Sequence, residues 1–185
     1  MADGDLNAIS TNVLENTVSG SEADDLDIYW MRRAIRQAEE GDTTPGGSPI
    51  GCVIVYEGKV IGEGFNEADI HCDPSAHAEI VAMRRAGKHV GSKEFRGATL
   101  YTTLQPCGMC SMASIWAKVG RIVYGAGRGD VHSSYFEDRH MNTIDFIRDA
   151  YRDDLSMRAG VLAQQCAALY IPPDADIPEE EQFNT

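Results

Sequence analysis

The chain has 185 residues, of which 43% are hydrophobic and 24% are charged. This composition is typical of a globular protein with one domain, and it excludes a chain with too few apolar residues to build a core. No apolar run reaches the ~20 residues that a membrane-spanning helix needs, and the first residues lack the pattern of a secretion signal. We therefore expect a cytoplasmic protein that does not bind membranes.

The formal net charge is -13, and the acidity is concentrated at the two ends. All 16 Lys and Arg residues lie within residues 27–171. We expect a flexible acidic leader over 1–25, a single domain over 26–171 and an acidic tail over 172–185. Because no run of Lys and Arg is present to neutralise phosphates, the sequence argues against a nucleic-acid partner.

Hydrophobic periodicity and turn residues divide the domain into helices and strands. In chain order the sequence predicts a helix over 26–40, a hairpin of strands over 50–56 and 60–65, a helix over 77–87, a strand over 98–104, a helix over 107–118, a strand over 121–124, and helices over 142–151 and 155–169. A strand pair followed by alternating helices and strands predicts the α/β class. The expected architecture is a three-layer α/β/α sandwich with a central mixed sheet of about five strands.

Two short motifs carry the chemistry, His77-Ala78-Glu79 and Pro106-Cys107-Gly108-Met109-Cys110. Cys107 and Cys110 are three residues apart at the first turn of a predicted helix, so both sulfurs point the same way and the positive helix end favours thiolates. A catalytic zinc takes three protein ligands of this kind and keeps one position for water. The motifs predict one catalytic Zn²⁺ per chain, bound by these cysteines and His77.

Glu79 is not needed as a ligand, and it lies two residues from His77. A carboxylate beside a zinc-activated water can take its proton and deliver it to the substrate, which is general acid/base catalysis. The pattern H-x-E followed by P-C-x-x-C is the signature of zinc deaminases. Two other classes remain open: a thiol oxidoreductase that uses Cys107 and Cys110, and a non-catalytic zinc-binding protein.

Several separate stretches between residues 26 and 130 resemble the cytidine deaminase-like superfamily, in its branch of small nucleobase deaminases. Gly47-Ser48-Pro49-Ile50-Gly51 is similar to the turn before the first strand of that branch, and Phe65-Asn66 to the end of its second strand. Asp73–Glu79 resembles the guanine deaminase form of the active-site helix. Leu100–Cys107 is closer to the cytosine deaminase form, so the resemblance is divided between two substrates.

The resemblance implies roles for four further residues. Asn66 would hydrogen-bond a ring carbonyl or ring nitrogen of the base, and the backbone N–H of Ala78 would meet the same edge. The backbone carbonyl of Gln105 would receive the departing ammonia. Asp130 falls where guanine deaminases place an acidic residue after the fourth strand. Relatives in the superfamily also pair, so the resemblance implies a homodimer.

Together these observations predict a hydrolytic deaminase of a free nucleobase or related amino-heterocycle, of the cytosine or guanine type. A zinc-bound hydroxide would attack the carbon that carries the amine, Glu79 would shuttle the protons, and ammonia would leave. A nucleoside deaminase of the guanosine type is one alternative. A tRNA adenosine deaminase is another, although it predicts a basic groove that the sequence does not indicate.

Some side chains have both a functional and a structural interpretation. The aromatic residues Trp116, Tyr135 and Phe136 can stack on a flat heterocycle or belong to the core or an interface. Asp130 can equally cap a helix. The arginine pair Arg84-Arg85 is most simply a solvated helix face.

Overall fold

The structure is a computed structural model that describes residues 20–136 and 154–178. The predicted helix over 142–151, most of the predicted leader and the end of the tail lie outside the described residues. Within the described part of the chain, no helix is both long enough and apolar enough to cross a membrane.

A five-stranded mixed sheet with the order β2-β1-β3-β4-β5 forms the centre of the domain. β1 is antiparallel to both β2 and β3, whereas β3, β4 and β5 run parallel. This arrangement confirms the predicted α/β class and the mixed sheet. The strands are β1 (Ser48–Tyr56), β2 (Lys59–Asn66), β3 (Thr99–Leu104), β4 (Arg121–Ala126) and β5 (Ser156–Arg158).

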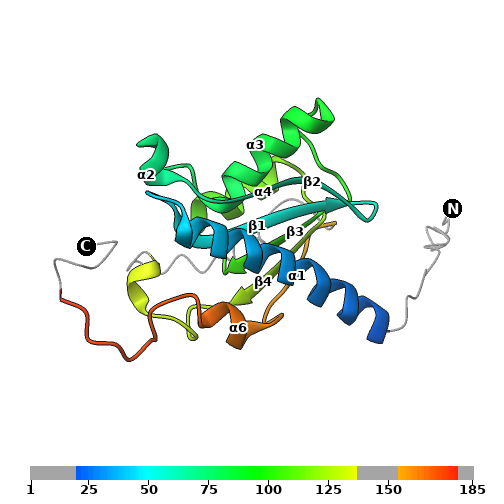
Figure 1. The fold of residues 1–185 in the computed structure, drawn as a ribbon. Coiled ribbons are helices and arrows are strands. Elements are labelled where there is room, and N and C mark those ends of the chain that lie inside the picture. The colour runs from blue at the N-terminus through cyan, green and yellow to red at the C-terminus, as the bar shows by residue number, and fades with distance from the viewer. Residues whose placement is uncertain (1–19, 137–153, 179–185) are drawn as a thin grey trace, which may run out of the picture.

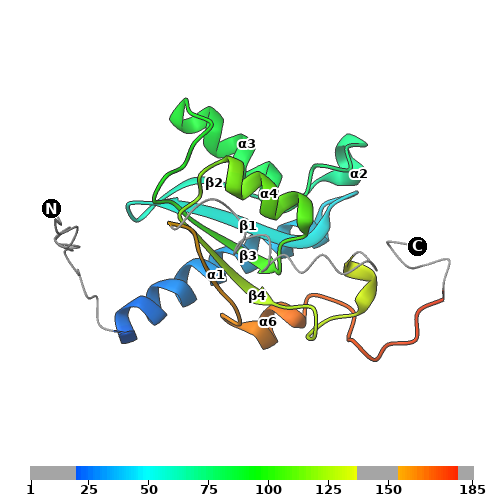
Figure 2. The same cartoon turned by 180° about the vertical axis from the view of Figure 1, so that it is seen from behind.

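Helices cover both faces of the sheet, and each face has its own buried core (Figures 1 and 2). α1 (Gly20–Thr43) and α6 (Ala163–Ala167) lie on one side. α3 (Ala78–Val90) and α4 (Gly108–Trp116) lie on the other. The three layers are therefore those expected from the sequence. Two short elements were not predicted, the helix α2 (Ala68–His71) and the 3-10 helix η1 (Ser133–Tyr135).

Two glycines let the long helices approach the sheet closely. A Cβ atom on Gly51 of β1 would lie 2.1 Å from the Ala34 carbonyl oxygen of α1. A Cβ atom on Gly62 of β2 would lie 2.3 Å from the Ala82 carbonyl oxygen of α3. Any side chain at these positions would push a helix away from the strands that it covers.

The C-terminal part of the described chain differs from the prediction of one helix over 155–169. Ser156–Arg158 instead pairs with β4 as the parallel edge strand β5, which satisfies the backbone groups of that edge of β4. Gly160 and Leu162 then adopt positive φ values of 80° and 55°, so a continuous helix is impossible there and only the short α6 follows. At the other end, α1 begins at Gly20 rather than at Leu26.

Candidate metal centre and adjoining pocket

The three predicted zinc ligands lie at the starts of two helices on the same face of the sheet. His77 is the N-cap residue of α3, and Cys107 is the N-cap residue of α4, both with extended backbone angles. Cys110 lies in the first turn of α4 and is fully buried. The positive ends of both helices therefore face one cluster, which favours thiolate sulfurs.

The distances within the cluster fit a tetrahedral zinc ion. His77 Nδ1 lies 3.6 Å from Cys107 Sγ and 3.7 Å from Cys110 Sγ. All ligand atoms of the three residues lie within 4.8 Å of one another. Zinc bound at about 2.3 Å to sulfur and about 2.0 Å to nitrogen requires ligand atoms roughly 3.5–3.8 Å apart. The predicted zinc site is thus confirmed as a cluster of the right chemistry and size.

The two thiols of the cluster compete for one negative charge. Hydrogen bonds from Cys110 and His77 lower the pKa of Cys107 to about 4. The same hydrogen bond to Cys107, together with burial, raises the pKa of Cys110. A divalent cation between the sulfurs favours both thiolates and removes this competition.

Glu79 lies beside the cluster on the first turn of α3 and is 4% exposed. Burial raises the pKa of its carboxyl group, and the negative charge of Cys107 adds to the effect. The hydroxyl of Thr102 on β3 donates a hydrogen bond of 3.2 Å to Glu79 Oε1. A carboxyl group that is buried, raised in pKa and held by the sheet has the properties of a general acid and base.

A small pocket of about 40 Å³ adjoins His77, Glu79 and Cys107. Its other described walls are Ile50, Leu104, Gln105 and Tyr135. No Lys or Arg occurs among these described lining residues. The described walls beside the predicted metal are therefore mostly apolar or aromatic and include no basic residue.

The structure brings Gln105 into the pocket wall, but the other predicted substrate residues have different surroundings. Asn66 ends β2, and its Oδ1 atom accepts a hydrogen bond from the Ala68 N–H at 3.0 Å. Ala78 is fully buried as the first residue of α3. Asp130 is exposed and accepts a hydrogen bond from the Gly127 N–H at 2.8 Å, so it holds the turn after β4.

Tyr135 reaches the pocket because the chain beyond α6 holds it there. The ring of Tyr170 packs edge-on against the ring of Tyr135, with 5.3 Å between their centroids. The Tyr170 hydroxyl donates to Thr103 Oγ1 at 2.6 Å, and the Ile171 N–H donates to the Tyr135 hydroxyl at 3.4 Å. Aromatic character suggested Tyr135 as a stacking residue, but its supports come from a segment about 35 residues further along the chain.

Sequence reasoning missed two side chains that act near the site, Thr102 and Glu67. It also assigned Arg84 and Arg85 to a solvated face, whereas both form ion pairs with residues that precede His77. The spacing could have indicated these contacts, because Arg84 and Arg85 are seven and eight positions after His77 and therefore lie on the same side of α3.

Comparison with known proteins agrees with this geometry. Residues 24–126 match the family described as the cytidine and deoxycytidylate deaminase zinc-binding region. The chain is 33% identical over 143 residues to a tRNA-specific adenosine deaminase of Buchnera aphidicola subsp. Schizaphis graminum, a match that covers 77% of this chain and 90% of the relative. It is 38% identical over 109 residues to the guanine deaminase of Bacillus subtilis, which covers 59% of this chain and 70% of the relative.

Among solved structures, that of a tRNA:A34 deaminase superposes with a TM-score of 0.64 at 29% identity. The match covers 76% of this chain and 98% of that chain. The family match spans more than half of the sequence and includes His77, Glu79, Cys107 and Cys110. The chain therefore belongs to the cytidine and deoxycytidylate deaminase family of zinc-dependent, hydrolytic deaminases.

Proposed function

We propose that the protein deaminates a free nucleobase or a related amino-heterocycle. The observation that carries this proposal is the composition of the pocket beside Glu79. Its described walls are apolar or aromatic apart from the catalytic cluster and Gln105, and they include no Lys or Arg to attract a phosphate. Walls of this kind favour a flat, neutral heterocycle over a ligand that carries a phosphate.

In this proposal His77, Cys107 and Cys110 hold the zinc ion, which when bound supplies an activated water. Glu79 would take a proton from the attacking water and deliver it to a ring nitrogen of the substrate. It then helps to protonate the leaving amine, so the substrate gains a carbonyl oxygen and releases ammonia. Burial raises the pKa of Glu79, which favours the protonated form that donates to the substrate.

Two further residues would orient the base, and a third would contact the leaving ammonia. The Oδ1 atom of Asn66 is occupied by the Ala68 N–H, so its NH₂ group is the part that can donate to a ring carbonyl or ring nitrogen. The Ala78 N–H would donate to the same edge of the base. The backbone carbonyl oxygen of Gln105 would receive the departing ammonia. The turn that Asp130 holds lies beside Gln105, because the Arg128 N–H in this turn donates a hydrogen bond of 3.3 Å to Gln105 Oε1.

A tRNA adenosine deaminase is the second candidate, and the comparisons are the observation that favours it. Two tRNA-specific adenosine deaminases are 33% and 34% identical to this chain, and the matches span 90% and 80% of their own lengths. The acidity of the chain argues for the free base, because a tRNA site requires Lys and Arg to neutralise phosphates. A nucleoside of the guanosine type remains a third candidate.

Ammonia release separates these candidates. The zinc-loaded protein is assayed with cytosine, guanine, adenine, their nucleosides, aminated triazines and a tRNA with adenosine at the wobble position, with Glu79→Ala as the control. Glu79-dependent release from a free base supports the proposal. Release from tRNA alone contradicts it and assigns the protein to the second candidate. If the zinc-bound protein releases ammonia from none of these substrates, the small-molecule function is excluded and a non-catalytic zinc protein is favoured.

We also propose that the protein is a homodimer. Met109, Met112 and Trp116 form an exposed apolar stripe along α4, and Trp116 is 74% exposed. Ala113 and Ala117, each next to a stripe residue in the sequence, line a groove of about 560 Å³ together with residues of α3. A second copy can bury this stripe against its own, as in an isologous interface. Sedimentation should show a dimer that Trp116→Glu dissociates; a monomeric wild type would contradict this.

A cytoplasmic location and the division into leader, domain and tail remain part of the proposal. All five cysteines are free in the structure, which suits a reducing compartment. Limited proteolysis tests the division, since cleavage should be confined to residues 1–25 and 172–185 if the middle segment folds as one unit.

A further inference from the structure

The segment between Asn66 and His77 contains little that packs against the core. α2 has no buried residue, and Cys72 ends it in a left-handed conformation with a φ of 49°. This short helix therefore owes its position to polar contacts rather than to apolar burial. The side chain of Asn66 is linked to this segment, because its Oδ1 atom accepts a hydrogen bond from the Ala68 N–H of α2.

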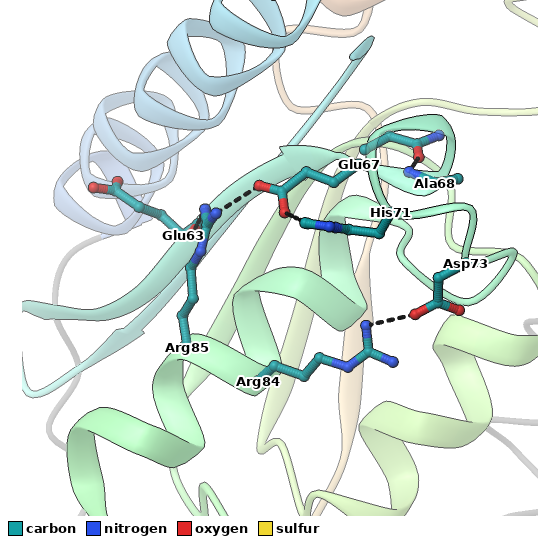
Figure 3. Close-up of polar contacts among 8 residues, drawn as sticks. Glu63, Glu67, Ala68, His71, Asp73, Arg84 and Arg85 are labelled. Atoms are coloured by element: carbon teal, nitrogen blue, oxygen red, sulfur yellow. Dashed lines mark hydrogen bonds and ion pairs between the residues drawn. The ribbon is translucent and has the colours of Figure 1, made fainter. Parts of the chain in front are cut away.

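Two neighbouring arginines of α3 hold the two ends of this segment (Figure 3). At its end, Arg84 donates to Asp73 Oδ2 at 3.1 Å and to Ser75 Oγ at 3.0 Å. At its start, Arg85 Nη2 donates to Glu67 Oε1 at 2.5 Å. We call these contacts the arginine clamp.

Glu67 is the central member of the clamp. Glu67 is only 7% exposed, and both of its carboxylate oxygens have a partner. Oε1 accepts from Arg85, and Oε2 lies 2.9 Å from His71 Nε2. Arg85 also donates to the Glu63 carbonyl oxygen at 2.9 Å, so its guanidinium group spans the end of β2. The carboxylate thus ties β2 to α3 on one side and to α2 on the other (Figure 3).

The backbone of Glu67 connects the same point to the metal cluster. Its N–H donates to the Ala76 carbonyl oxygen at 2.9 Å, directly before His77. Asn66 precedes Glu67, and its Oδ1 accepts from the Ala68 N–H in the turn that follows. A turn that is fixed in this way keeps the Asn66 oxygen engaged and its NH₂ group directed elsewhere.

We propose that Glu67 is a positioning residue: its carboxylate, bound by Arg85 and His71, holds the turn that presents the Asn66 NH₂ group to the substrate. This inference rests on the proposed function, since it assigns Asn66 to the base. It also requires a substrate with a hydrogen-bond acceptor on the ring, such as a carbonyl oxygen or an unprotonated nitrogen.

Glu67→Ala tests the proposal, and Glu63→Ala is its matched control. Glu63 lies on β2 and Glu67 lies directly after it, and each carboxylate pairs with one arginine, but Glu63 pairs with Arg33 of α1 rather than with Arg85 of α3. Glu67→Ala should raise the KM for the base that the wild type deaminates roughly tenfold, with kcat and zinc content nearly unchanged. Glu63→Ala should leave KM unchanged.

Two further variants show whether Glu67 acts through its assigned partners. Arg85→Met keeps the aliphatic stem and should reproduce the higher KM by breaking the clamp from the other side. In an Asn66→Ala background, Glu67→Ala should raise KM no further, because the residue that it positions is already absent. Independent, additive effects of the two substitutions would overturn the proposal.

Hydrogen exchange gives a readout that does not depend on activity. Amides of residues 67–76 should exchange roughly tenfold faster in Glu67→Ala and at the wild-type rate in Glu63→Ala. Unchanged exchange and an unchanged KM would overturn the proposal, and so would a loss of zinc and kcat with KM constant. If the wild type deaminates no member of the panel, the proposed function fails, whereas faster exchange would still identify Glu67 as the residue that holds the turn.

Discussion

The Thr102 hydroxyl donates a hydrogen bond to Glu79 Oε1 over 3.2 Å, from a fully buried position on β3. One carboxylate oxygen of Glu79 is thus fixed by the sheet. We expect Thr102→Val, which removes the hydroxyl but keeps the volume, to lower kcat about tenfold, because Glu79, the proposed proton-transfer group, loses its orientation. KM and zinc content should not change. Steady-state ammonia release and metal analysis measure these quantities.

Thr102→Ser is the control for this prediction, because it keeps the hydroxyl and removes only a methyl group. It should restore most of the wild-type kcat. A Thr102→Val protein with the wild-type kcat would show that Glu79 does not depend on this hydrogen bond.

The metal cluster allows a second prediction, with an internal control. Cys107→Ser should lose the bound zinc, whereas Cys72→Ser should keep one ion per chain, because Cys72 is exposed and lies outside the cluster. Zinc binding links the starts of α3 and α4. Its removal by a chelator should therefore lower the free energy of unfolding by roughly 3 kcal/mol when free zinc had been about 100 times its dissociation constant.

Metal analysis and thermal unfolding of the three proteins check this prediction. The competing interpretation as a thiol oxidoreductase expects a reversible disulfide between Cys107 and Cys110 without bound metal. A wild-type protein that binds no zinc and cycles between thiol and disulfide would contradict the metal assignment.

The metal cluster was predictable because it depends on local rules. Each of its two motifs, a ligand at the start of a helix and two cysteines three residues apart, can be recognised from spacing alone, whereas the contact between them joins residues 30 positions apart and comes from the fold. The hairpin was predictable for a similar reason, because Glu57 and Gly58 form a two-residue turn with positive φ values of 48° and 71°. In the hairpin, and within each metal-binding motif, the local sequence contains the information that the structure uses.

The arginine clamp and β5 were not predictable in this way. Glu67 and Arg85 are 18 positions apart, and a charged pair on a helix resembles a solvated face until its partners are known. β5 has only three residues and exists because β4 offers it an edge. Its strand character comes from tertiary pairing, which overrides the apolar spacing that indicated a helix.

Asp27 carries a third prediction, about stability. It is 1% exposed and accepts two hydrogen bonds of 2.7 Å from Arg121, one of 3.0 Å from Tyr101 and one of 2.6 Å from Arg158. These contacts join α1 to β3, β4 and β5. We expect Asp27→Asn to lower the free energy of unfolding by about 3 kcal/mol at neutral pH, as for other broken buried ion pairs. Asp25→Asn, on the exposed side of the same helix, is the control.

The pH dependence follows from the pKa of Asp27. Burial alone would raise this pKa, but the hydrogen bonds and charge of Arg121 outweigh burial and lower it. A lowered pKa in the folded state means that the stabilisation is complete above the unfolded value of about 3.9 and is lost as the pH falls through the folded value. The difference between wild type and Asp27→Asn, measured by denaturant unfolding, should therefore shrink below about pH 4. A difference that is constant with pH would contradict this.

Tyr135 provides the fourth prediction, because its ring is the aromatic wall of the pocket. Stacking of a base on an aromatic ring contributes about 1–3 kcal/mol, so Tyr135→Ala should raise the KM for a free base roughly tenfold. The lost ring also leaves more room, and the ratio of kcat/KM for the nucleoside to that for its base should increase. Tyr135→Phe keeps the ring and should bind the base like the wild type, although it loses the hydrogen bond from Ile171.

The three KM values distinguish stacking from support of the C-terminal segment. If the ring acts by contact with the base, Tyr135→Phe resembles the wild type and Tyr135→Ala does not. If instead the hydroxyl acts by holding Ile171, Tyr135→Phe should show the same loss as Tyr135→Ala, and Tyr170→Phe, which removes the hydrogen bond to Thr103, should share it. Such a result would reassign the tyrosines to the anchoring of the segment after α6, and the base would then require a different stacking surface.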